Sequence, residues 1–199
     1  MFDYFFPGLI GYLLGNISSA YIYVRHVLHV DIREMGSGNA GATNVNRILG
    51  FKVALRVFLL DVVKGVAAVL VGGWLSGSTG AMIAGLAVVA GHDWPVVLNF
   101  RGGKGMATTL GVLLILLPQA ALMAALVFVA VVATTRYVSL GSILICLALA
   151  PVGVLLDQST HQVLLFGLLG LMGVFQHRGN LVRLINGTES RLVLSRLTN

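Results

Sequence analysis

Three polar, glycine-rich stretches of this sequence hold the residue types that could recognise an anion and react with it. They read GSGNAGATNVNR from Gly36 to Arg47, FRGGKGMAT from Phe100 to Thr108, and HRGNLVRLINGTESR from His177 to Arg191. Glycine allows backbone N–H groups to approach an anion closely, and hydroxyl and amide side chains add neutral donors. Arginine binds phosphate with a planar fork, whereas lysine acts as a point charge. The three stretches therefore predict a site for two phosphates, or for one phosphate and a reacting carbonyl.

Two phosphate-binding patterns that these glycines mimic do not fit the sequence. Gly36, Gly38 and Gly41 spell GxGxxG, but the dinucleotide-binding motif needs a strand before it and a helix after it. The GGKG segment also departs from the P-loop, because Leu98 stands at the first glycine position and Gly105 at the Ser or Thr position. We therefore reject both nucleotide-binding interpretations.

The rest of the chain is apolar enough to belong in a membrane. Of its 199 residues, 57% are hydrophobic and 10% are charged, against about 25% charged in an ordinary soluble domain. Long apolar runs predict an all-α integral membrane protein, with a single transmembrane domain over residues 1–199. The net charge of +6 then reports topology and contact with anionic lipid or substrate, and we expect no nucleic acid partner.

Seven apolar segments are expected to form the transmembrane helices. The fourth is short for a span, and Pro118 separates it from the fifth. Joining these two into one helix kinked at Pro118 would give six spans, but we favour about seven. The segments cover residues 5–25, 53–73, 79–98, 105–117, 119–135, 138–156 and 160–177.

The lysines and arginines predict the orientation of the helices. With the N-terminus outside, the connections 26–52, 99–104 and 136–137 are cytoplasmic, as are the tail from 178 and the C-terminus. A six-span arrangement would instead divide these basic residues between the two sides, which the positive-inside rule disfavours. The basic residues on the cytoplasmic side are Arg33, Arg47, Lys52, Arg101, Lys104, Arg136, Arg178, Arg183, Arg191 and Arg196.

All three polar stretches then lie on the cytoplasmic face of the membrane. The segment RYVSLGS adds Ser139 and Ser142 at the start of the sixth helix. Ordinary solvated loops are the simpler explanation, but such loops do not need so many glycines beside amides, hydroxyls and cations. Distant clusters that share one face therefore predict a single site there.

A few reactive side chains lie outside these stretches and are assigned structural roles. Asp61 and Lys64 lie about one helical turn apart inside the second segment, so we expect a buried pair that neutralises itself. Lys64 is kept as a secondary site, because ionisable residues inside a membrane are functional candidates. His92 and Asp93 are expected to cap a helix or to support other residues, and Cys146 to serve packing. No metal-ligand spacing occurs, so we expect no metal.

The order of the motifs resembles a known family. SGNAGATN is followed by Arg47, then by GGKGMAT, and later by HRGN and RLINGTE. GH stands upstream of Pro95, and RYVSLGSI lies before the last motifs. This series is similar, almost end to end, to the bacterial acyl-phosphate:glycerol-3-phosphate acyltransferases. The chain departs from the family pattern at Gln176, where a basic residue is expected before His177.

The resemblance implies an enzyme of the bacterial inner membrane whose active site faces the cytoplasm. It would move a fatty acyl group from acyl phosphate to the sn-1 hydroxyl of glycerol 3-phosphate, giving lysophosphatidic acid and inorganic phosphate for phospholipid biosynthesis. Its partners would be acyl phosphate, glycerol 3-phosphate and membrane lipid, with no cofactor and no obligatory protein partner. Because acyl phosphate is already activated, no Ser–His–Asp or Cys–His signature is needed, and catalysis would depend on positioning and electrostatic stabilisation.

We assign roles to individual residues on this basis. Arg47, Lys104 and His177 are the candidate catalytic residues, with Lys104 bridging the two substrates and stabilising developing charge. Either His177 or the substrate's own phosphate would accept the proton of the attacking hydroxyl. Glu189 is expected to order the tail by pairing with a basic residue. Arg47, Ser142, His177 and Asn180 would hold glycerol 3-phosphate, and the full set of candidate binding residues is Ser37, Gly38, Asn39, Gly41, Thr43, Asn44, Arg47, Gly102, Gly103, Lys104, Ser142, His177 and Asn180.

Other functions explain part of the sequence. A transporter or channel for an organophosphate would also use glycine-rich breaks and basic residues, but only Asp61 and Lys64 lie at mid-depth. An acyltransferase that uses acyl-CoA could employ His26 as base and Asp31 as its orienter, because they match the H-x4-D pattern of another glycerolipid acyltransferase class. The acyl donor separates that enzyme from the one favoured here. A purely structural membrane protein would not need three phosphate-type loops.

Overall fold

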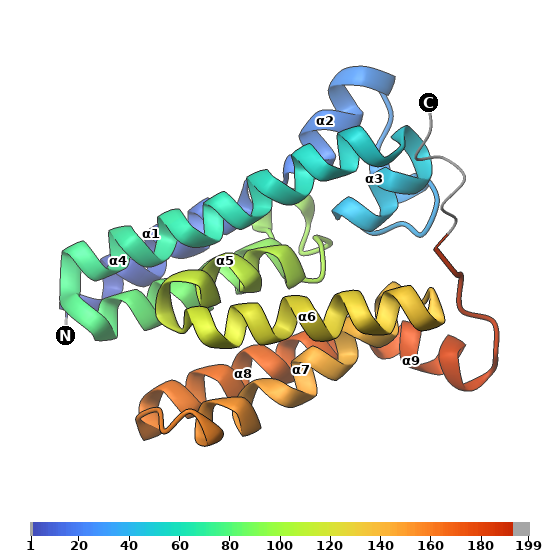
Figure 1. Cartoon of the computed structure of the whole chain (residues 1–199). Helices are drawn as coiled ribbons and strands as arrows, with labels where there is room; N and C mark the ends of the chain where they lie inside the picture. The colour runs from blue at the N-terminus through green and yellow to red at the C-terminus, as the bar shows by residue number, and fades with distance from the viewer. Residues whose placement is uncertain (1, 193–199) are drawn as a thin grey trace. The chain divides into compact units, whose positions relative to one another are not determined.

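The structure is a computed structural model that describes residues 2–192, and every regular element in this range is a helix (Figure 1). The predicted all-α architecture is therefore confirmed. The chain divides into two compact units, one ending at Leu116 and the other beginning at Leu117. The first contains η1 (Phe2–Tyr4), α1 (Phe5–Asn16), α2 (Ser19–Leu28), η2 (Ile32–Glu34), α3 (Ala42–Leu49), α4 (Phe51–Asp93), η3 (Val96–Leu98) and α5 (Met106–Leu116). The second contains α6 (Pro118–Thr135), α7 (Val138–Leu155), α8 (Thr160–Gln176) and α9 (Arg178–Ile185).

Helix α4 is a hairpin made of two helical halves. Ser76 (φ −148°, ψ 29°) and Gly77 (φ 63°, ψ −155°) leave helical geometry, and the second combination of angles is open to glycine alone. Gly72 and Gly80 face each other on the two sides of this turn. A Cβ on Gly72 would lie 2.4 Å from the carbonyl oxygen of Gly80, and a Cβ on Gly80 would lie 2.3 Å from that of Gly72. Small residues of this kind let helix backbones approach closely in membranes. The turn confirms the connection predicted near residues 74–78.

Glycines also set the contacts of α4 with α1 and α5. A Cβ on Gly91 would lie 2.2 Å from the carbonyl oxygen of Tyr12, which brings α1 against the second half of α4. A Cβ on Gly65 would lie 2.4 Å from the carbonyl oxygen of Thr108, which brings α5 against the first half. The core of the first unit is therefore built on backbone contact between α1, α4 and α5 (Figure 1).

The first apolar segment forms two helices instead of one. Helix α1 ends at Asn16, because Ile17 (φ −71°, ψ 96°) and Ser18 (φ −87°, ψ 97°) are extended. The Ser18 hydroxyl then caps α2 by accepting a hydrogen bond at 3.3 Å from a backbone N–H of its first turn. The interruption turns the carbonyl oxygens of Gly15 and Ile17 toward α4, where Lys64 binds both.

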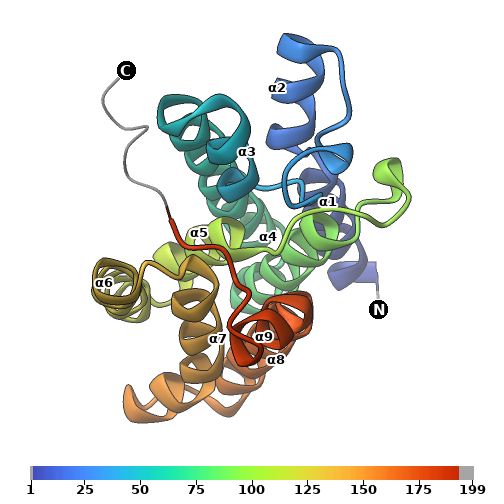
Figure 2. The same ribbon diagram turned by 90° about the vertical axis from the view of Figure 1, so that its right-hand side faces the viewer.

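In the second unit, α7 packs against both α6 and α8 (Figures 1 and 2). A Cβ on Gly170 of α8 would lie 2.3 Å from the carbonyl oxygen of Cys146, and the Cys146 thiol is buried, which confirms its packing role. Pro118 occupies the first turn of α6, after Leu117 (φ −156°, ψ 78°), so α5 and α6 are separate helices as predicted. A capping box at Ser159 begins α8.

Three helical stretches among the described residues, the first of which includes the break between α1 and α2, are long and apolar enough to cross a membrane. They are Phe5–Leu28, Pro118–Thr135 and Val138–Leu155, while Met106–Leu116 and Thr160–Gln176 are apolar but shorter. The third predicted segment ends earlier than expected, because α4 stops at Asp93 and residues 96–98 form η3. The count of seven spans and the orientation stay predictions, and Arg196 lies outside the described residues.

Adjacent glycines provide a matched test of the α4 hairpin. The substitution Gly72→Ala would place a methyl group 2.4 Å from the carbonyl oxygen of Gly80, and forcing the two halves apart should cost about 1–3 kcal/mol. Gly73→Ala meets its nearest neighbour at 3.6 Å and should not lower stability, because alanine also favours the helix. Both tryptophans of the chain lie in this unit, so their fluorescence during thermal unfolding in detergent measures the difference. Equal unfolding midpoints for the two variants would contradict the packing described here.

Candidate active site

Asn44 holds the first glycine-rich loop in shape. Its side chain is 1% exposed, and its Oδ1 accepts a hydrogen bond from the backbone N–H of Ser37 at 2.8 Å. Its Nδ2 donates to the carbonyl oxygens of Met35 at 2.9 Å and Ile32 at 3.3 Å. Both hydrogens and the oxygen of the amide are thus used inside the loop. Asn44 is placed to shape the loop, whereas the sequence predicts that it contacts a phosphate.

The loop that Asn44 shapes runs directly into the N-terminus of α3. Gly36 and Gly38 adopt the left-handed region, with φ of 58° and 72°, and Gly41 is the N-cap of the helix. The first turn of a helix presents backbone N–H groups and the positive end of the helix dipole, both of which favour an anion. The exposed side chains on and beside this turn are Ser37, Thr43 and Arg47.

An Asp31–Arg33 ion pair fixes the start of this loop. The guanidinium of Arg33 lies 2.6 Å from Oδ2 of Asp31 and also donates to the carbonyl oxygen of Leu98 at 2.7 Å. The hydrogen bond from Arg33 lowers the pKa of Asp31 from its usual 3.8. Because the Asp31 carboxylate is paired with Arg33, it is not arranged to orient the ring of His26. This geometry argues against the acyl-CoA-dependent alternative.

The glycines of the second loop bind it to the end of α4. The backbone N–H of Gly102 donates to the carbonyl oxygen of Asp93 at 3.1 Å. The backbone N–H of Gly103 donates to the carbonyl oxygen of His92 at 3.0 Å. These bonds satisfy carbonyl groups that a helix leaves without partners at its C-terminus. The sequence predicts that the two N–H groups face a phosphate, but the structure uses them to hold the loop. These bonds therefore fix the backbone that leads into Lys104.

Gly102 also joins the second loop to the first. Its carbonyl oxygen accepts hydrogen bonds from the backbone N–H of Ala40 and from Nδ2 of Asn39, both at 3.4 Å. Figure 2 shows the two loops, in blue and green, on one end of the first unit. Lys104 follows Gly102 by two residues and is half-buried. The first two polar stretches are thus brought together, as predicted.

The predicted ion pair between Asp61 and Lys64 is confirmed. Nζ of Lys64 lies 3.0 Å from Oδ1 of Asp61, and the two residues are 7% and 1% exposed. His92 joins this pair, with its Nδ1 2.7 Å from the same Nζ. The expectation that His92 supports other residues therefore agrees with its contacts.

Glu189 organises the third polar stretch, in the second unit. Its Oε1 accepts hydrogen bonds from Nδ2 of Asn180 at 2.6 Å and from the Ser139 hydroxyl at 2.8 Å, and its Oε2 accepts one from Arg183 at 2.7 Å. Burial raises the pKa of Glu189, but the three hydrogen bonds together outweigh it and hold the pKa below its usual 4.5. The predicted pairing of Glu189 with a basic residue is confirmed.

His177 lies at the junction of α8 and α9 and is 3% exposed. Its Nδ1 is 2.8 Å from the carbonyl oxygen of Gly173. A carbonyl oxygen can only accept, so Nδ1 carries a proton and Nε2 of the neutral ring carries a lone pair. This tautomer suits His177 to accept a proton from a hydroxyl. Ser142 is also 3% exposed and lies on α7, one turn after Ser139.

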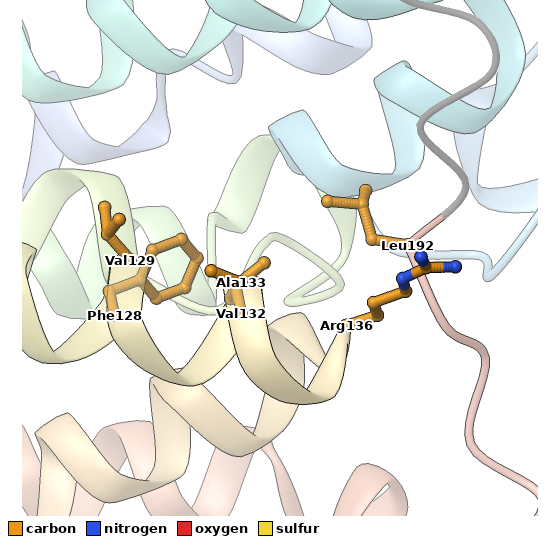
Figure 3. Close-up of a pocket in the computed structure, with 6 residues that line it drawn as sticks. All are labelled: Phe128, Val129, Val132, Ala133, Arg136 and Leu192. Atoms are coloured by element: carbon orange, nitrogen blue, oxygen red, sulfur yellow. The ribbon is translucent and has the colours of Figure 1, made fainter.

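An apolar pocket of about 300 Å³ lies elsewhere in the second unit, at the end of α6 (Figure 3). Arg136 is the single charged residue of its lining, and none of the predicted site residues takes part. The pocket suits hydrocarbon better than phosphate. Its lining residues are Phe128, Val129, Val132, Ala133, Arg136 and Leu192.

The structure adds residues that sequence reasoning left out of the site. Arg33 joins the start of the first loop to Leu98 of η3, and Ser139 shares the Glu189 carboxylate with Asn180. Asp31 and Arg33 are two residues apart, and this spacing of opposite charges is a local signal for an ion pair. Nothing near Ser139 in the sequence indicates its partner Glu189, 50 residues away. The third stretch forms its own cluster, and its participation in a site with the first two stays a prediction.

Solved structures with the same fold establish the class of protein. The chain matches the crystal structure of PlsY (YgiH), an integral membrane glycerol 3-phosphate acyltransferase, in its glycerol 3-phosphate form, with a TM-score of 0.91 and 36% identity over 98% of both chains. It matches the lysophosphatidic acid form of PlsY with a TM-score of 0.87 and 35% identity over 97% of both chains. The chain is therefore an α-helical integral membrane protein.

Sequence comparison defines the family. The family model for glycerol-3-phosphate acyltransferase matches residues 5–187. A glycerol-3-phosphate acyltransferase of Thermoanaerobacter sp. (strain X514) is 52% identical over 185 residues, covering 92% of this chain and 93% of the relative. One of Clostridioides difficile (strain 630) is 43% identical over 198 residues, covering 96% and 97%. The chain belongs to the glycerol-3-phosphate acyltransferase family.

The substitution Glu189→Gln should loosen the segment after α9. The amide keeps the shape of the carboxylate but loses its charge, and hydrogen bonds to a charged group contribute about 1.5–3 kcal/mol each. We expect hydrogen–deuterium exchange of residues 186–192 to rise about tenfold at pH 7. The exposed Glu34, changed in the same way to Gln, is the control and should leave this exchange unchanged.

The wild-type protein should show the same loosening in acid. Because the folded-state pKa of Glu189 lies below 4.5, its ionised form stabilises the second unit above pH 4.5, and this stabilisation is lost as the pH falls below that value. Exchange is corrected for the intrinsic effect of pH. If the amides of residues 186–192 exchange equally slowly in Glu189→Gln and in wild type, the Glu189 carboxylate does not anchor this segment.

Proposed function

We propose that this protein transfers a fatty acyl group from acyl phosphate to the sn-1 hydroxyl of glycerol 3-phosphate. The hydroxyl oxygen attacks the acyl carbon, the bond from that carbon to the phosphate oxygen breaks, and the hydroxyl proton passes to a base. The products are lysophosphatidic acid and inorganic phosphate. The observation that carries the proposal is the junction at Gly102, where two glycine-rich loops meet two residues before Lys104.

Acyl phosphate suits this site because it is already activated. Its mixed anhydride carries a good leaving group, so the reaction needs no covalent enzyme intermediate. What it needs is a fixed geometry and positive charge near the departing phosphate and the oxyanion. The rigid attachment of the second loop to α4 supports Lys104 in this role, because it limits how far the lysine backbone can move.

The first unit is proposed to bind phosphate through the start of α3. Ser37 and Thr43 supply hydroxyl donors there, and Arg47 adds a guanidinium on the same short helix. Asn39 and Gly41 contribute backbone donors. Gly38, whose N–H donates to the carbonyl oxygen of Met35 at 2.9 Å, contributes to the local shape that Asn44 also stabilises. The exposure of Ser37, Thr43 and Arg47 supports this role, because a ligand can reach them.

The second unit is proposed to hold glycerol 3-phosphate and to accept its proton. His177 has its Nδ1 proton committed to Gly173, so Nε2 is the atom that would accept a proton from the sn-1 hydroxyl. Asn180 is fixed by Glu189 and would bind the same substrate together with Ser142. The substrate phosphate is the alternative base, because its second pKa is about 6.

We further propose seven membrane spans in the bacterial inner membrane, with the N-terminus outside and the C-terminus in the cytoplasm. Basic residues in the connections 26–52, 99–104 and 136–137 support this orientation. The polar loops of the first unit then face the cytoplasm. No cofactor and no obligatory protein partner are needed for the proposed reaction.

An assay of the purified protein tests the proposed reaction. Glycerol 3-phosphate is supplied with palmitoyl phosphate or with palmitoyl-CoA, and phosphate release and lysophosphatidic acid are followed. Product is expected from palmitoyl phosphate alone. Product only from palmitoyl-CoA would overturn the donor, and binding of glycerol 3-phosphate without any product would favour a transporter.

The substitutions Lys104→Ala and Arg47→Ala should each lower kcat/KM at least about 10²–10³-fold, as the loss of one oxyanion or phosphate donor does. Lys52→Ala is the control, because Lys52 is an exposed cation of α4 outside the polar loops and should leave activity near normal. A comparable loss in Lys52→Ala would show that general positive charge matters more than the site.

The substitution His177→Ala distinguishes the two candidate bases. If Nε2 accepts the proton, kcat should fall about 10²–10⁴-fold, and the acidic limb of the pH–rate profile should disappear. If the substrate phosphate is the base, kcat stays near normal and only KM for glycerol 3-phosphate rises. Steady-state kinetics over a range of pH values measure both quantities.

A further inference from the structure

A buried polar cluster in the first unit has no part in the reaction proposed above. Asp61 and Lys64 belong to the first half of α4, and His92 closes its second half. These three residues are 1%, 7% and 6% exposed. Charged groups inside an apolar core are costly to bury, so a cluster of this kind calls for an explanation beyond stability.

The contacts of Lys64 define its protonation and that of His92. Nζ lies 2.9 Å from the carbonyl oxygen of Ile17, 3.3 Å from that of Gly15, and 3.0 Å from Oδ1 of Asp61. Two carbonyl oxygens and a carboxylate around one nitrogen are the environment of an ammonium group. Its three hydrogens serve Gly15, Ile17 and His92, and Asp61 balances its charge. An ammonium group cannot accept a hydrogen bond, so Nδ1 of His92, at 2.7 Å, must be the acceptor. The neutral ring then carries its proton on Nε2.

The opposite edge of the His92 ring supports the second polar loop. A Cβ on Gly103 would lie 2.0 Å from Nε2, so the glycine backbone rests directly on the ring. The carbonyl oxygen of His92 accepts the N–H of Gly103 at 3.0 Å, and a Cβ on Gly102 would lie 2.0 Å from this oxygen. His92 therefore contacts the loop with both its ring and its backbone, one residue before Lys104.

We propose that Lys64 and His92 are positioning residues for Lys104. Asp61 and the carbonyl oxygens of the α1–α2 break fix the ammonium of Lys64, which fixes the ring of His92. The ring and carbonyl group of His92 then fix the distance between the Gly102–Gly103 backbone and the end of α4. This inference rests on the proposed function only in the role that it gives to Lys104.

The consequence for rate is large compared with the size of the movement. A displacement of about 1 Å in a catalytic group can lower the rate about 10²-fold, even when the change lies far from the reacting atoms. If the cluster served stability alone, its replacement would alter unfolding and would affect the rate equally with and without Lys104. A positioning role instead requires that the effect on rate pass through Lys104.

Two variants separate these possibilities. Lys64→Met by itself would leave Asp61 as an unpaired buried charge, so it is combined with Asp61→Asn. The double variant removes the ion pair and the donor to His92 but keeps side-chain volume, and it should unfold at a temperature near that of wild type. His92→Asn retains an acceptor near Lys64 and removes the ring edge beneath Gly103. It breaks the same chain of contacts at its last link.

We expect kcat with palmitoyl phosphate to fall about 10–100-fold in both variants. Introduced into Lys104→Ala, each should lower the residual rate less than threefold, because the group that it positions is already missing. Hydrogen–deuterium exchange of the Gly102 and Gly103 amides should also rise. The control is Tyr23→Phe with Arg56→Met, which removes another polar contact between α4 and α2 at 3.2 Å and should change neither quantity.

Additive losses of rate in the Lys104→Ala background, or amides of Gly102 and Gly103 that stay as protected as in wild type, would overturn the positioning role. A wild-type protein that forms no product from palmitoyl phosphate would instead overturn the proposed function. In that case the exchange of the two glycine amides in each variant still decides whether Lys64 and His92 hold the loop.

Discussion

The hydrogen bonds of Gly102 are the interaction on which the polar side of the first unit depends. Its N–H binds the carbonyl group of Asp93 at the end of α4, and its carbonyl binds Ala40 and Asn39 of the other loop. A helix that ends near a membrane surface leaves carbonyl groups without partners. The second loop supplies those partners, and glycine is required because a Cβ would collide with the His92 carbonyl oxygen. The end of α4 therefore determines the position of the second loop.

Each unit contains a buried charged group that several distant segments share. In the first unit it is the ammonium of Lys64, which receives oxygen atoms from α4 and from the α1–α2 break. In the second it is the carboxylate of Glu189, which accepts from α7 and from α9. A buried charge is tolerated only when all of its partners are in place, so it favours one arrangement of those partners over the others. Both groups therefore act as fixed points around which loops are ordered.

The sequence predicted features that depend on local chemistry. Pro118 cannot continue a helix that precedes it, so the start of α6 fell where expected, and the turn of α4 lies in the gap between the predicted segments 53–73 and 79–98. The Asp61–Lys64 pair follows from helical spacing, and a partner for Glu189 follows from the basic residues nearby. The convergence of the first two polar stretches was also predictable, because both follow apolar segments that end on the same face.

What the sequence did not predict depends on contacts between distant residues. The amide of Asn44 could bind a phosphate or a loop, and only the positions of Ile32 and Met35 decide between them. The N–H groups of Gly102 and Gly103 could face a ligand or a helix end, and only the position of His92 and Asp93 decides. The break after Asn16 lacks a proline or glycine at Ile17 and Ser18, and it is stabilised by a lysine 47 residues away from Ile17.

That break resembles, in its chemistry, the discontinuous helices through which some membrane transporters capture an alkali metal ion. In such helices, unwound carbonyl oxygens surround a cation that arrives from solution and leaves again. Here the carbonyl oxygens of Gly15 and Ile17 surround a cation that is covalently part of the chain. Its occupancy is set when the protein folds and is independent of the salt composition on either side of the membrane. An architecture suited to an exchangeable ion thus becomes a permanent joint between α1, α2 and α4.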